Sequence, residues 1–304
     1  MKYIECVPNI SEGRRPEIVK EIAAQVDKVK EAYLLDISSD SDHNRSVITF
    51  AGIPEAVSEA AFQLTKRASR LIDLNKHEGK HPRMGATDVV PFIPLSGAQM
   101  EDCIKIAVDT GKRIGFELGI PVFLYEYAAT RKERKNLADV RHGEFEGLRE
   151  EIGKNPDKTP DFGPNKIHPT AGATVIGARE FLIAYNVNLN SPDISIARTI
   201  AKKIRTKDGG LPAVKALGLF LPEKGITQVS MNLVNFKTTS IEKVYQEIEK
   251  EAEKHNVEII ESELIGLMPQ SAYYDGLEKR TKIDDFSLNQ IVENRLQKSI
   301  KDKI

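Results

Sequence analysis

Two copies of one element order, strand, helix, strand, strand, helix, strand, are predicted from the hydrophobic pattern of this chain. Short apolar runs indicate the strands, and apolar residues spaced three and four apart indicate the helices. This βαββαβ order is the split βαβ arrangement of ferredoxin-like domains. The first copy has strands at 3–7, 33–37, 46–51 and 89–95 and helices at 16–29 and 54–72; the second has strands at 181–189, 214–220, 227–234 and 257–264 and helices at 191–204 and 240–255.

We therefore predict an α+β protein, an α/β sandwich made of two ferredoxin-like βαββαβ subdomains packed side by side. Residues 1–178 form the N-terminal subdomain and residues 179–304 the C-terminal one. A helix at 100–118, a strand at 122–125 and a helix near 144–151 extend the first copy, and a polar helix at 288–304 is predicted to cover a surface.

Composition excludes several classes of function. The net charge of −1 creates no field that favours nucleic acid or a membrane surface, so neither is a predicted partner. No apolar run approaches the 18 residues or so that a transmembrane helix needs. Only Cys6 and Cys103 are present, too few for a disulfide framework, and we expect a cytoplasmic protein.

Residues 77–81 match the string H-E-x-x-H, which on a helix would place two histidines on one face to bind zinc. Here Pro82 directly follows His81. Its ring would clash with the carbonyl of Glu78 in a helix, and it disfavours the α region for His81. We therefore predict a loop, and no metal site.

A histidine in such a loop suits proton transfer, because an ordinary imidazole has a pKa of about 6.5. The neighbouring Arg83 has the planar fork that binds a carboxylate with two hydrogen bonds. The alternative is a solvated polar loop without function. Residues 153–172, rich in glycine and proline, form a second long loop, which is either functional or a surface crossover.

Several short sequence blocks, taken together, argue against a solvated loop without function around His81. In this order and spacing the blocks resemble the formiminotransferase family over about residues 4–270. They are Glu5-Cys6-Val7-Pro8-Asn9-Ile10-Ser11-Glu12-Gly13, Asn44-Arg45, His81-Pro82-Arg83-Met84-Gly85-Ala86 with Asp88, Asp161-Phe162-Gly163-Pro164, Gly172-Ala173-Thr174-Val175, Ala184-Tyr185-Asn186-Val187-Asn188-Leu189 and Gln228-Val229-Ser230-Met231-Asn232-Leu233.

The resemblance implies a glutamate formimidoyltransferase, which moves the formimino group of N-formimino-L-glutamate to N5 of tetrahydrofolate and releases L-glutamate. It implies tetrahydrofolate as co-substrate, no metal, a homodimer and a role in histidine degradation. Animal members carry a cyclodeaminase domain as well, and here we expect a separate cyclodeaminase. By the resemblance, His81 is the catalytic acid and base, and the folate-binding loop is Gly163, Pro164, Asn165, Lys166, Ile167, His168, Pro169, Thr170, Ala171 and Gly172.

Charge complementarity suggests the remaining site residues. Arg45 and Arg83 are predicted to bind the carboxylates of formiminoglutamate. Asp36 or Asp88 is predicted to stabilise positive charge on the amidine carbon, with a turn-capping role as the alternative for each. The further predicted substrate-binding residues are Asn9, Asn44, Asn186 and Asn188, with a buried, satisfied amide as the alternative for Asn9, Asn186 and Asn188.

Two other functions stay open at this point. One is an ATP-using 5-formyltetrahydrofolate cyclo-ligase, against which the lack of a Walker A loop argues. The other is a folate-binding protein without turnover, which would need no acid–base residue at position 81.

Overall fold

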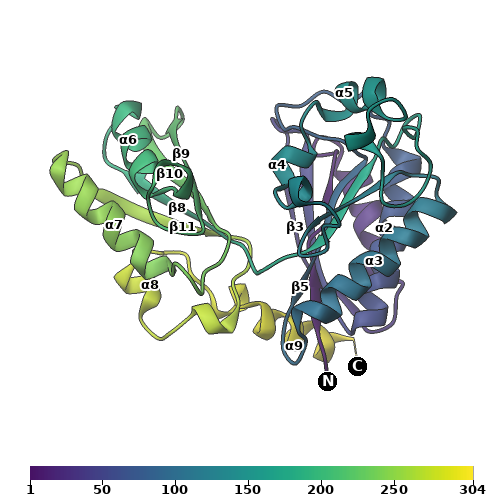
Figure 1. The fold of residues 1–304 in the computed structure, drawn as a ribbon. Coiled ribbons are helices and arrows are strands. Elements are labelled where there is room, and N and C mark those ends of the chain that lie inside the picture. Colours follow the sequence, from purple (N-terminus) through teal and green to yellow (C-terminus); the bar gives the residue numbers. More distant parts are fainter. Residues whose placement is uncertain (304) are drawn as a thin grey trace. The chain divides into compact units, whose positions relative to one another are not determined.

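The computed structural model describes residues 1–303 and has the mixed α+β class that the sequence predicts. The chain divides into two compact units (Figure 1). The first comprises Met1–Arg179 together with the end of the chain from Lys298, and the second comprises Glu180–Gln297. Among residues 1–303, no helix has both the length and the apolar character that crossing a membrane requires.

The sheet of the first unit is built around a broken first strand. Its two parts, β1 and β2, each lie between β4 and β5 and are antiparallel to both. Strand β3 pairs with the other edge of β4, and β7 is inserted in parallel between β5 and β6. The strands are β1 (Ile4–Cys6), β2 (Asn9–Ile10), β3 (Ala32–Asp40), β4 (Arg45–Gly52), β5 (Thr87–Pro94), β6 (Val122–Glu126) and β7 (Thr174–Ala178).

Strand β7 has no counterpart among the predicted elements. Its five residues directly follow the long loop, and the run contains Gly177, which is depleted in strands. A Cβ at Gly177 would lie 2.4 Å from the carbonyl oxygen of Tyr125 on the neighbouring strand. The glycine is therefore needed where β6 and β7 approach closely, a reason that appears only in three dimensions.

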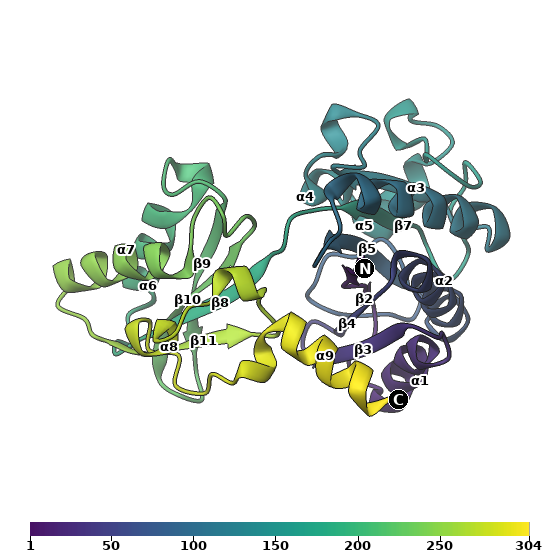
Figure 2. The same ribbon diagram turned by 90° about the horizontal axis from the view of Figure 1, so that it is seen from below.

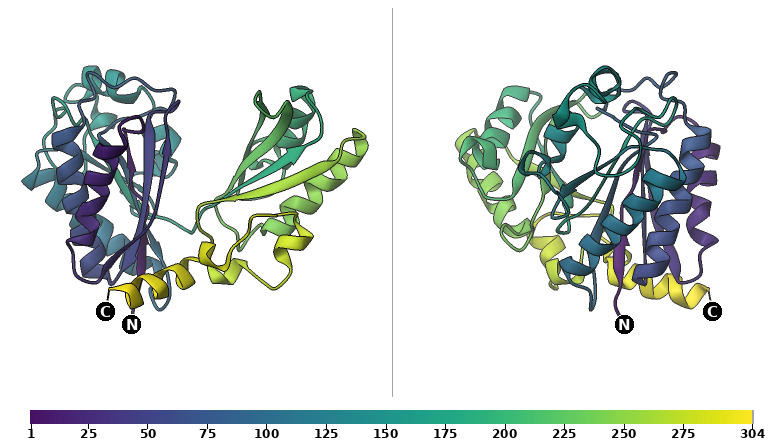
Figure 3. Two further views of the ribbon diagram at one scale, coloured as in Figure 1. Left: turned by 180° about the vertical axis from the view of Figure 1, so that it is seen from behind. Right: turned by 45° about the vertical axis from the view of Figure 1, so that its right-hand side comes forward.

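Helices cover one face of this sheet, as Figure 3 shows for the first unit. Helices α1 (Pro16–Asp27), α2 (Pro54–Leu71) and α3 (Met100–Glu117) pack on it through the main apolar core. A second, smaller core lies on the other face of β5, β6 and β7, where the segment with α4 (Leu137–Val140) and α5 (Glu144–Glu151) packs. Those three strands are buried on both faces, which explains their unbroken apolar runs.

The second unit repeats the strand and helix order of the first unit's beginning. Its antiparallel sheet has the strand order β11-β8-β10-β9 (Figure 2). The elements are β8 (Ile183–Leu189), α6 (Ile194–Ile204), β9 (Val214–Leu221), β10 (Ile226–Leu233), α7 (Ile241–Lys254), β11 (Ile259–Ile265) and α8 (Leu277–Arg280). Helix α9 (Val292–Asp302) begins in this unit, and its part from Lys298 belongs to the first unit.

Helix boundaries shift by a few residues from the predicted ones. Helix α6 begins at Ile194, three residues later than predicted, because the side chain of Asp193 caps it by accepting from the Ser195 amide. The tail is helical from Val292 rather than from Leu288. Short 3₁₀ helices occupy Lys132–Arg134, Pro156–Lys158, Thr206–Asp208, Gln270–Ala272 and Leu288–Gln290.

Candidate functional site

A pocket of about 190 Å³ lies in the first unit, where β2 ends and β4 and β5 begin. It brings together five of the predicted site residues, which come from two distant segments of the chain. Its lining consists of Ile10, Ser11, His43, Asn44, Arg45, His77, His81, Arg83 and Asp88. A larger pocket of about 870 Å³ adjoins it and shares Ser11, Asn44 and His77.

The H-E-x-x-H string is a loop, as Pro82 predicts, because the chain has no helix between α2 and α3. Both ring nitrogens of His77 have protein partners. Its Nε2 lies 2.8 Å from the carbonyl oxygen of Asn44, and Arg83 Nε donates to its Nδ1 at 3.2 Å. In this arrangement Nδ1 accepts from Arg83 and Nε2 donates to the Asn44 carbonyl, so neither ring nitrogen is left to bind a metal. In the described part of the chain, no group of three or more potential ligands could hold a metal ion.

Asn44 ties this loop to the start of β4. Its side-chain oxygen accepts from the Gly13 amide at 2.9 Å, and its side-chain nitrogen donates to the carbonyl of Glu78 at 2.9 Å. Its backbone has a positive φ of 49°, a conformation that asparagine tolerates better than most residues. The geometry thus gives Asn44 a positioning role, and its predicted contact with substrate stays a prediction.

Arg45 points into the pocket and is oriented by Asn9. The side-chain oxygen of Asn9 accepts from Arg45 Nη2, while its nitrogen donates to the carbonyl of Val7 at 3.0 Å. Burial, and next the charge of Arg141, lower the pKa of Arg45 to about 10. Asn9 is therefore a buried, satisfied amide, the alternative that the sequence left open, and it holds a cationic side chain at the pocket.

Asp88 is buried and accepts from two directions. Its Oδ1 accepts from the Met84 amide at 2.7 Å, and its Oδ2 forms an ion pair with Arg141. These contacts fix the loop that carries His81, so the geometry favours the turn-capping alternative for Asp88. Its predicted role next to the amidine carbon stays untested.

Electrostatics keep His81 neutral. The side chain is partly buried, and burial, followed by the charges of Arg45 and Arg141, lowers the pKa of His81 to about 4 against an opposing contribution from Asp88. At neutral pH the imidazole therefore has a free lone pair and can accept a proton. This is the state that a general base requires before the reaction begins.

His43 stands next to His81, with the two rings edge to face and their centroids 6.2 Å apart. Its Nδ1 lies 2.6 Å from Oδ2 of Asp40, and its amide donates to Oδ1 of the same residue at 2.8 Å. Burial opposes ionisation of Asp40, but these hydrogen bonds from His43 lower the pKa of its carboxyl. Asp40 is thus an ionised carboxylate near the pocket that the sequence did not single out.

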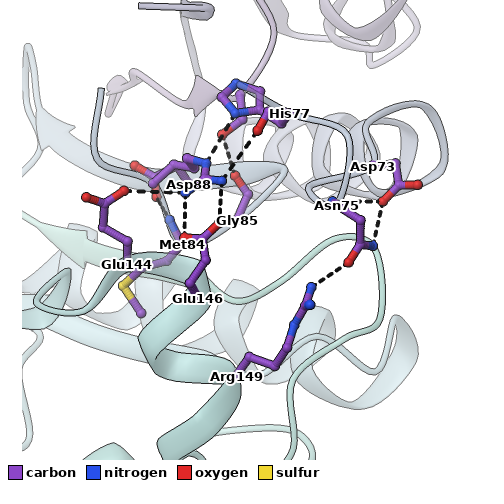
Figure 4. Close-up of polar contacts among 11 residues, drawn as sticks. Asp73, Asn75, His77, Met84, Gly85, Asp88, Glu144, Glu146 and Arg149 are labelled. Atoms are coloured by element: carbon purple, nitrogen blue, oxygen red, sulfur yellow. Dashed lines mark hydrogen bonds and ion pairs between the residues drawn. The ribbon is translucent and has the colours of Figure 1, made fainter. Parts of the chain in front are cut away.

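Arg83 clamps helix α5 to the loop. Its two terminal nitrogens bind the carboxylate of Glu146 at 2.8 and 2.7 Å, and Nη1 lies 3.4 Å from Glu144 (Figure 4). The amide of Phe145 also donates to the Arg83 carbonyl at 2.9 Å. The hydrogen bonds with Glu146 raise the pKa of Arg83. Arg83 could bind a substrate carboxylate, as predicted, only by giving up Glu146.

The predicted folate loop packs directly against the loop that carries His81. The amide of Ala86 donates to the carbonyl of Ala171, and the amide of Leu74 donates to that of Thr170, both at 2.9 Å. A Cβ on Gly172, whose φ is +71°, would lie 2.1 Å from the Met84 carbonyl oxygen. The glycine is therefore obligatory at this contact.

His168 shapes the tip of that loop. Its Nδ1 accepts from the amides of Thr170 and Ala171 at 3.3 and 3.0 Å, and its backbone pairs with Gly172. Burial lowers the pKa of His168, which keeps Nδ1 free to accept. Asn165, Lys166 and Pro169 are the exposed residues of residues 163–172.

Asp36, Asn186 and Asn188 are predicted site residues that do not line this pocket. Asp36 lies opposite Thr49 in the β3–β4 pair, four residues and about 13 Å along β4 from Arg45. Asn186 and Asn188 belong to β8 of the second unit. Asn188 is fully buried and donates to Glu261 and Glu263 at 2.8 and 3.0 Å, so it matches the satisfied-amide alternative.

Sequence reasoning missed Arg141 and the pair of Asp40 with His43. Arg141 lies 53 positions from Asp88, in a polar segment without a recognisable motif, so nothing in its spacing marks it. Asp40 and His43 do carry a weak signal. They are three residues apart in the polar turn that leads into Arg45, where their side chains can pair locally.

Comparison with known proteins shows which family the chain belongs to. Residues 3–179 match the family model described as "Formiminotransferase domain, N-terminal subdomain", and residues 184–296 match the one described as "Formiminotransferase domain". A glutamate formimidoyltransferase of Streptococcus pyogenes serotype M1 is 48% identical over 296 residues, which cover 97% of this chain and 99% of the relative.

A glutamate formimidoyltransferase of Thermoplasma acidophilum is 46% identical over 304 residues, covering 98% of this chain and 99% of the relative. The formimidoyltransferase-cyclodeaminase of Rattus norvegicus is 41% identical over 306 residues, covering 97% of this chain and 56% of the relative. Similarity at this level over nearly the whole chain shows that this protein belongs to the formiminotransferase family.

Proposed function

We propose that this protein is a glutamate formimidoyltransferase that moves the formimino group of N-formimino-L-glutamate to N5 of tetrahydrofolate and releases L-glutamate. The names of the two microbial relatives support this activity. The observation that carries it at the site is the imidazole of His81, whose pKa is lowered, in a small pocket that Arg45 and Arg83 also line.

In this reaction His81 acts first as base and then as acid. N5 of tetrahydrofolate attacks the formimino carbon, and His81 accepts the proton that N5 loses. The bond from that carbon to the glutamate nitrogen then breaks, and the protonated His81 returns the proton to the departing nitrogen. One proton moves from N5 to glutamate, so the charges and atoms balance without a metal or a covalent enzyme intermediate.

The lowered pKa of His81 has a consequence for the acid step. An imidazolium placed beside two guanidinium groups is a strong acid, so it gives up its proton readily to the leaving nitrogen. The remaining acceleration in this scheme comes from holding the two substrates in line. The rigid hydrogen bonds of Asp88 and Asn44 to the loop serve that purpose.

The loop of residues 163–172 is proposed to bind tetrahydrofolate. Its hydrogen bonds to residues 74 and 86 place it beside the loop with His81, and its exposed Asn165 and Lys166 offer polar contacts. The pocket is too small to enclose a whole substrate, because ligand pockets for molecules of this size run to several hundred Å³.

We also propose a cytoplasmic homodimer that acts in histidine degradation, with a cyclodeaminase acting next on the folate product. The name of the rat relative, which joins the two activities, supports the last step. Sedimentation of the purified protein is the direct test of the dimer.

The test of the function is an assay of the purified protein with formiminoglutamate and tetrahydrofolate. We expect glutamate release that requires both substrates. A parallel reaction with 5-formyltetrahydrofolate and ATP is expected to form no ADP. ADP formation without glutamate release would indicate a cyclo-ligase instead. Saturable folate binding without any turnover would indicate a folate-binding protein.

A further inference from the structure

The charges of two guanidinium groups, those of Arg45 and Arg141, act on His81, and both groups have an incomplete set of partners. Arg45 comes from β4 and binds Asn9, while Arg141 follows α4 and pairs with Asp88. Within residues 1–303, Nε of each arginine is buried without a hydrogen-bond partner. A buried, unpaired donor costs about 1–3 kcal/mol, and more when it is charged, so these atoms point to an acceptor supplied by a ligand.

The nearby carboxylates are engaged by groups other than Arg45. Asp88 is paired with Arg141, and the ionised Asp40 is engaged by His43. The other arginine of the pocket, Arg83, is matched by Glu146 and Glu144. Arg45 has an amide rather than a carboxylate as its hydrogen-bond partner. Burial and then the charge of Arg141 lower its pKa, and the charges of Asp88 and Asp40 offset only part of this effect. An anion next to both arginines would relieve this repulsion.

We propose that Arg45 and Arg141 form a clamp for the α-carboxylate of formiminoglutamate, with Arg141 as a specificity-determining residue. This inference rests on the proposed function. The α-carboxylate carbon and the formimino-bearing nitrogen are attached to the same carbon atom, so they lie about 2.5 Å apart. A clamp on that carboxylate beside His81 therefore places the leaving nitrogen next to the group that must protonate it.

The clamp also explains why the arginines do not hinder the reaction. Before substrate binds, burial and then the charges of the two arginines lower the pKa of His81, which keeps it unprotonated. The bound carboxylate neutralises part of their charge, so the imidazolium that forms after N5 loses its proton is better tolerated. The γ-carboxylate, at the far end of a flexible chain, cannot serve this purpose with the same geometry.

The test compares two substrates, formiminoglutamate and the N-formimino derivative of 4-aminobutyrate, which lacks only the α-carboxylate. With tetrahydrofolate fixed, we expect the wild type to prefer formiminoglutamate by at least about 100-fold in kcat/KM. In Arg141→Ala the preference is expected to fall to less than about tenfold. In Lys154→Ala, an exposed position in the same segment, it is expected to stay at the wild-type value.

The ratio of the two kcat/KM values does not depend on the folded fraction, so a loss of stability in Arg141→Ala leaves the comparison valid. Arg141→Lys keeps a cation opposite Asp88 and is expected to give an intermediate preference, since lysine lacks the planar fork. An unchanged preference in Arg141→Ala would overturn the clamp. Absence of turnover with formiminoglutamate in the wild type would instead overturn the proposed function.

Discussion

The two units share one order of strands and helices but differ in the leading strand and the charged groups beside it, although a buried oxygen of the second unit, Thr227 Oγ1, also lacks a partner among residues 1–303. In the first unit the leading strand is broken between β1 and β2, and the pocket that follows leaves arginine nitrogens without partners among residues 1–303. In the second unit the equivalent strand β8 is continuous. Its buried Asn188 binds Glu261 and Glu263 and accepts from Gln228 at 2.8 Å.

This difference suggests where the chemistry lies. Fully paired polar groups stabilise a structure, whereas unpaired buried donors and a histidine with a shifted pKa are typical of functional sites. The additions to the first unit supply those features. The segment with α4 and α5 brings Arg141, and the loop before β5 brings His81.

The largest expected difference in stability concerns ion pairs. In the first unit Arg134 and Asp161, with side chains only 4% and 9% exposed, are 2.5 Å apart. Arg134→Ala should lower the free energy of unfolding by about 3–5 kcal/mol, because it leaves a buried carboxylate without its cation. Lys224→Ala in the second unit removes an exposed ion pair and should leave the free energy of unfolding, measured by denaturant titration, unchanged. Equal losses would show that the two units do not differ in this respect.

Glycine positions give the next contrast. A Cβ at Gly85 would lie 1.9 Å from the carbonyl oxygen of Ala173, so Gly85→Ala should cost about 3 kcal/mol and disturb the loop that carries His81. The turn glycine Gly225 of the second unit has open space around it and a positive φ of 66°. Gly225→Ala should cost about 1 kcal/mol. A small cost at Gly85, measured by thermal unfolding, would mean that the loop contact is loose.

Titration of His81 tests the electrostatics of the site. Its pKa of about 4 predicts that the ring stays neutral at pH 5, where an imidazole with the ordinary value of 6.5 is only about 3% neutral. The measurement is an NMR titration of labelled histidine, with His81→Ala to identify the signal. A midpoint above pH 6 would contradict the arrangement of Arg45 and Arg141.

The same pKa shift determines how the free energy of unfolding changes with pH. Above pH 6.5 the folded and unfolded states both hold His81 neutral, so the group has no effect on the pH dependence there. As the pH falls from 6.5 towards 4, the unfolded state binds a proton that the folded state does not, and stability is lost. His81→Ala should reduce this loss between pH 7 and pH 4.5.

The smallest predicted effect on activity belongs to the second unit. Asn188→Ala removes donors to two glutamates but no group that we propose to transfer protons. If Asn188 also binds substrate, as its sequence position suggests, KM should rise by less than about tenfold with kcat unchanged, the pattern of lost uniform binding. A fall in kcat would place chemistry in the second unit and break the comparison.

The sequence predicted much of this account, and the failures have physical reasons. Periodicity located the repeated elements, and Pro82 identified the loop, because both are local properties of the chain. Strand β7 was missed because a short strand with a glycine is defined by its parallel neighbours. Arg141 was missed because its partner Asp88 is distant in sequence. The partner of Arg83 on α5, Glu146, could not be predicted either, because it too is distant in sequence.

The central claim is that His81 carries the proton in formimino transfer. Its most direct test is the rate of glutamate release in His81→Ala, compared with the wild type and with His142→Ala, an exposed histidine of the same unit. We predict a fall in kcat of at least about 100-fold for His81→Ala and no change for His142→Ala. Equal rates of release for His81→Ala and the wild type would contradict the claim.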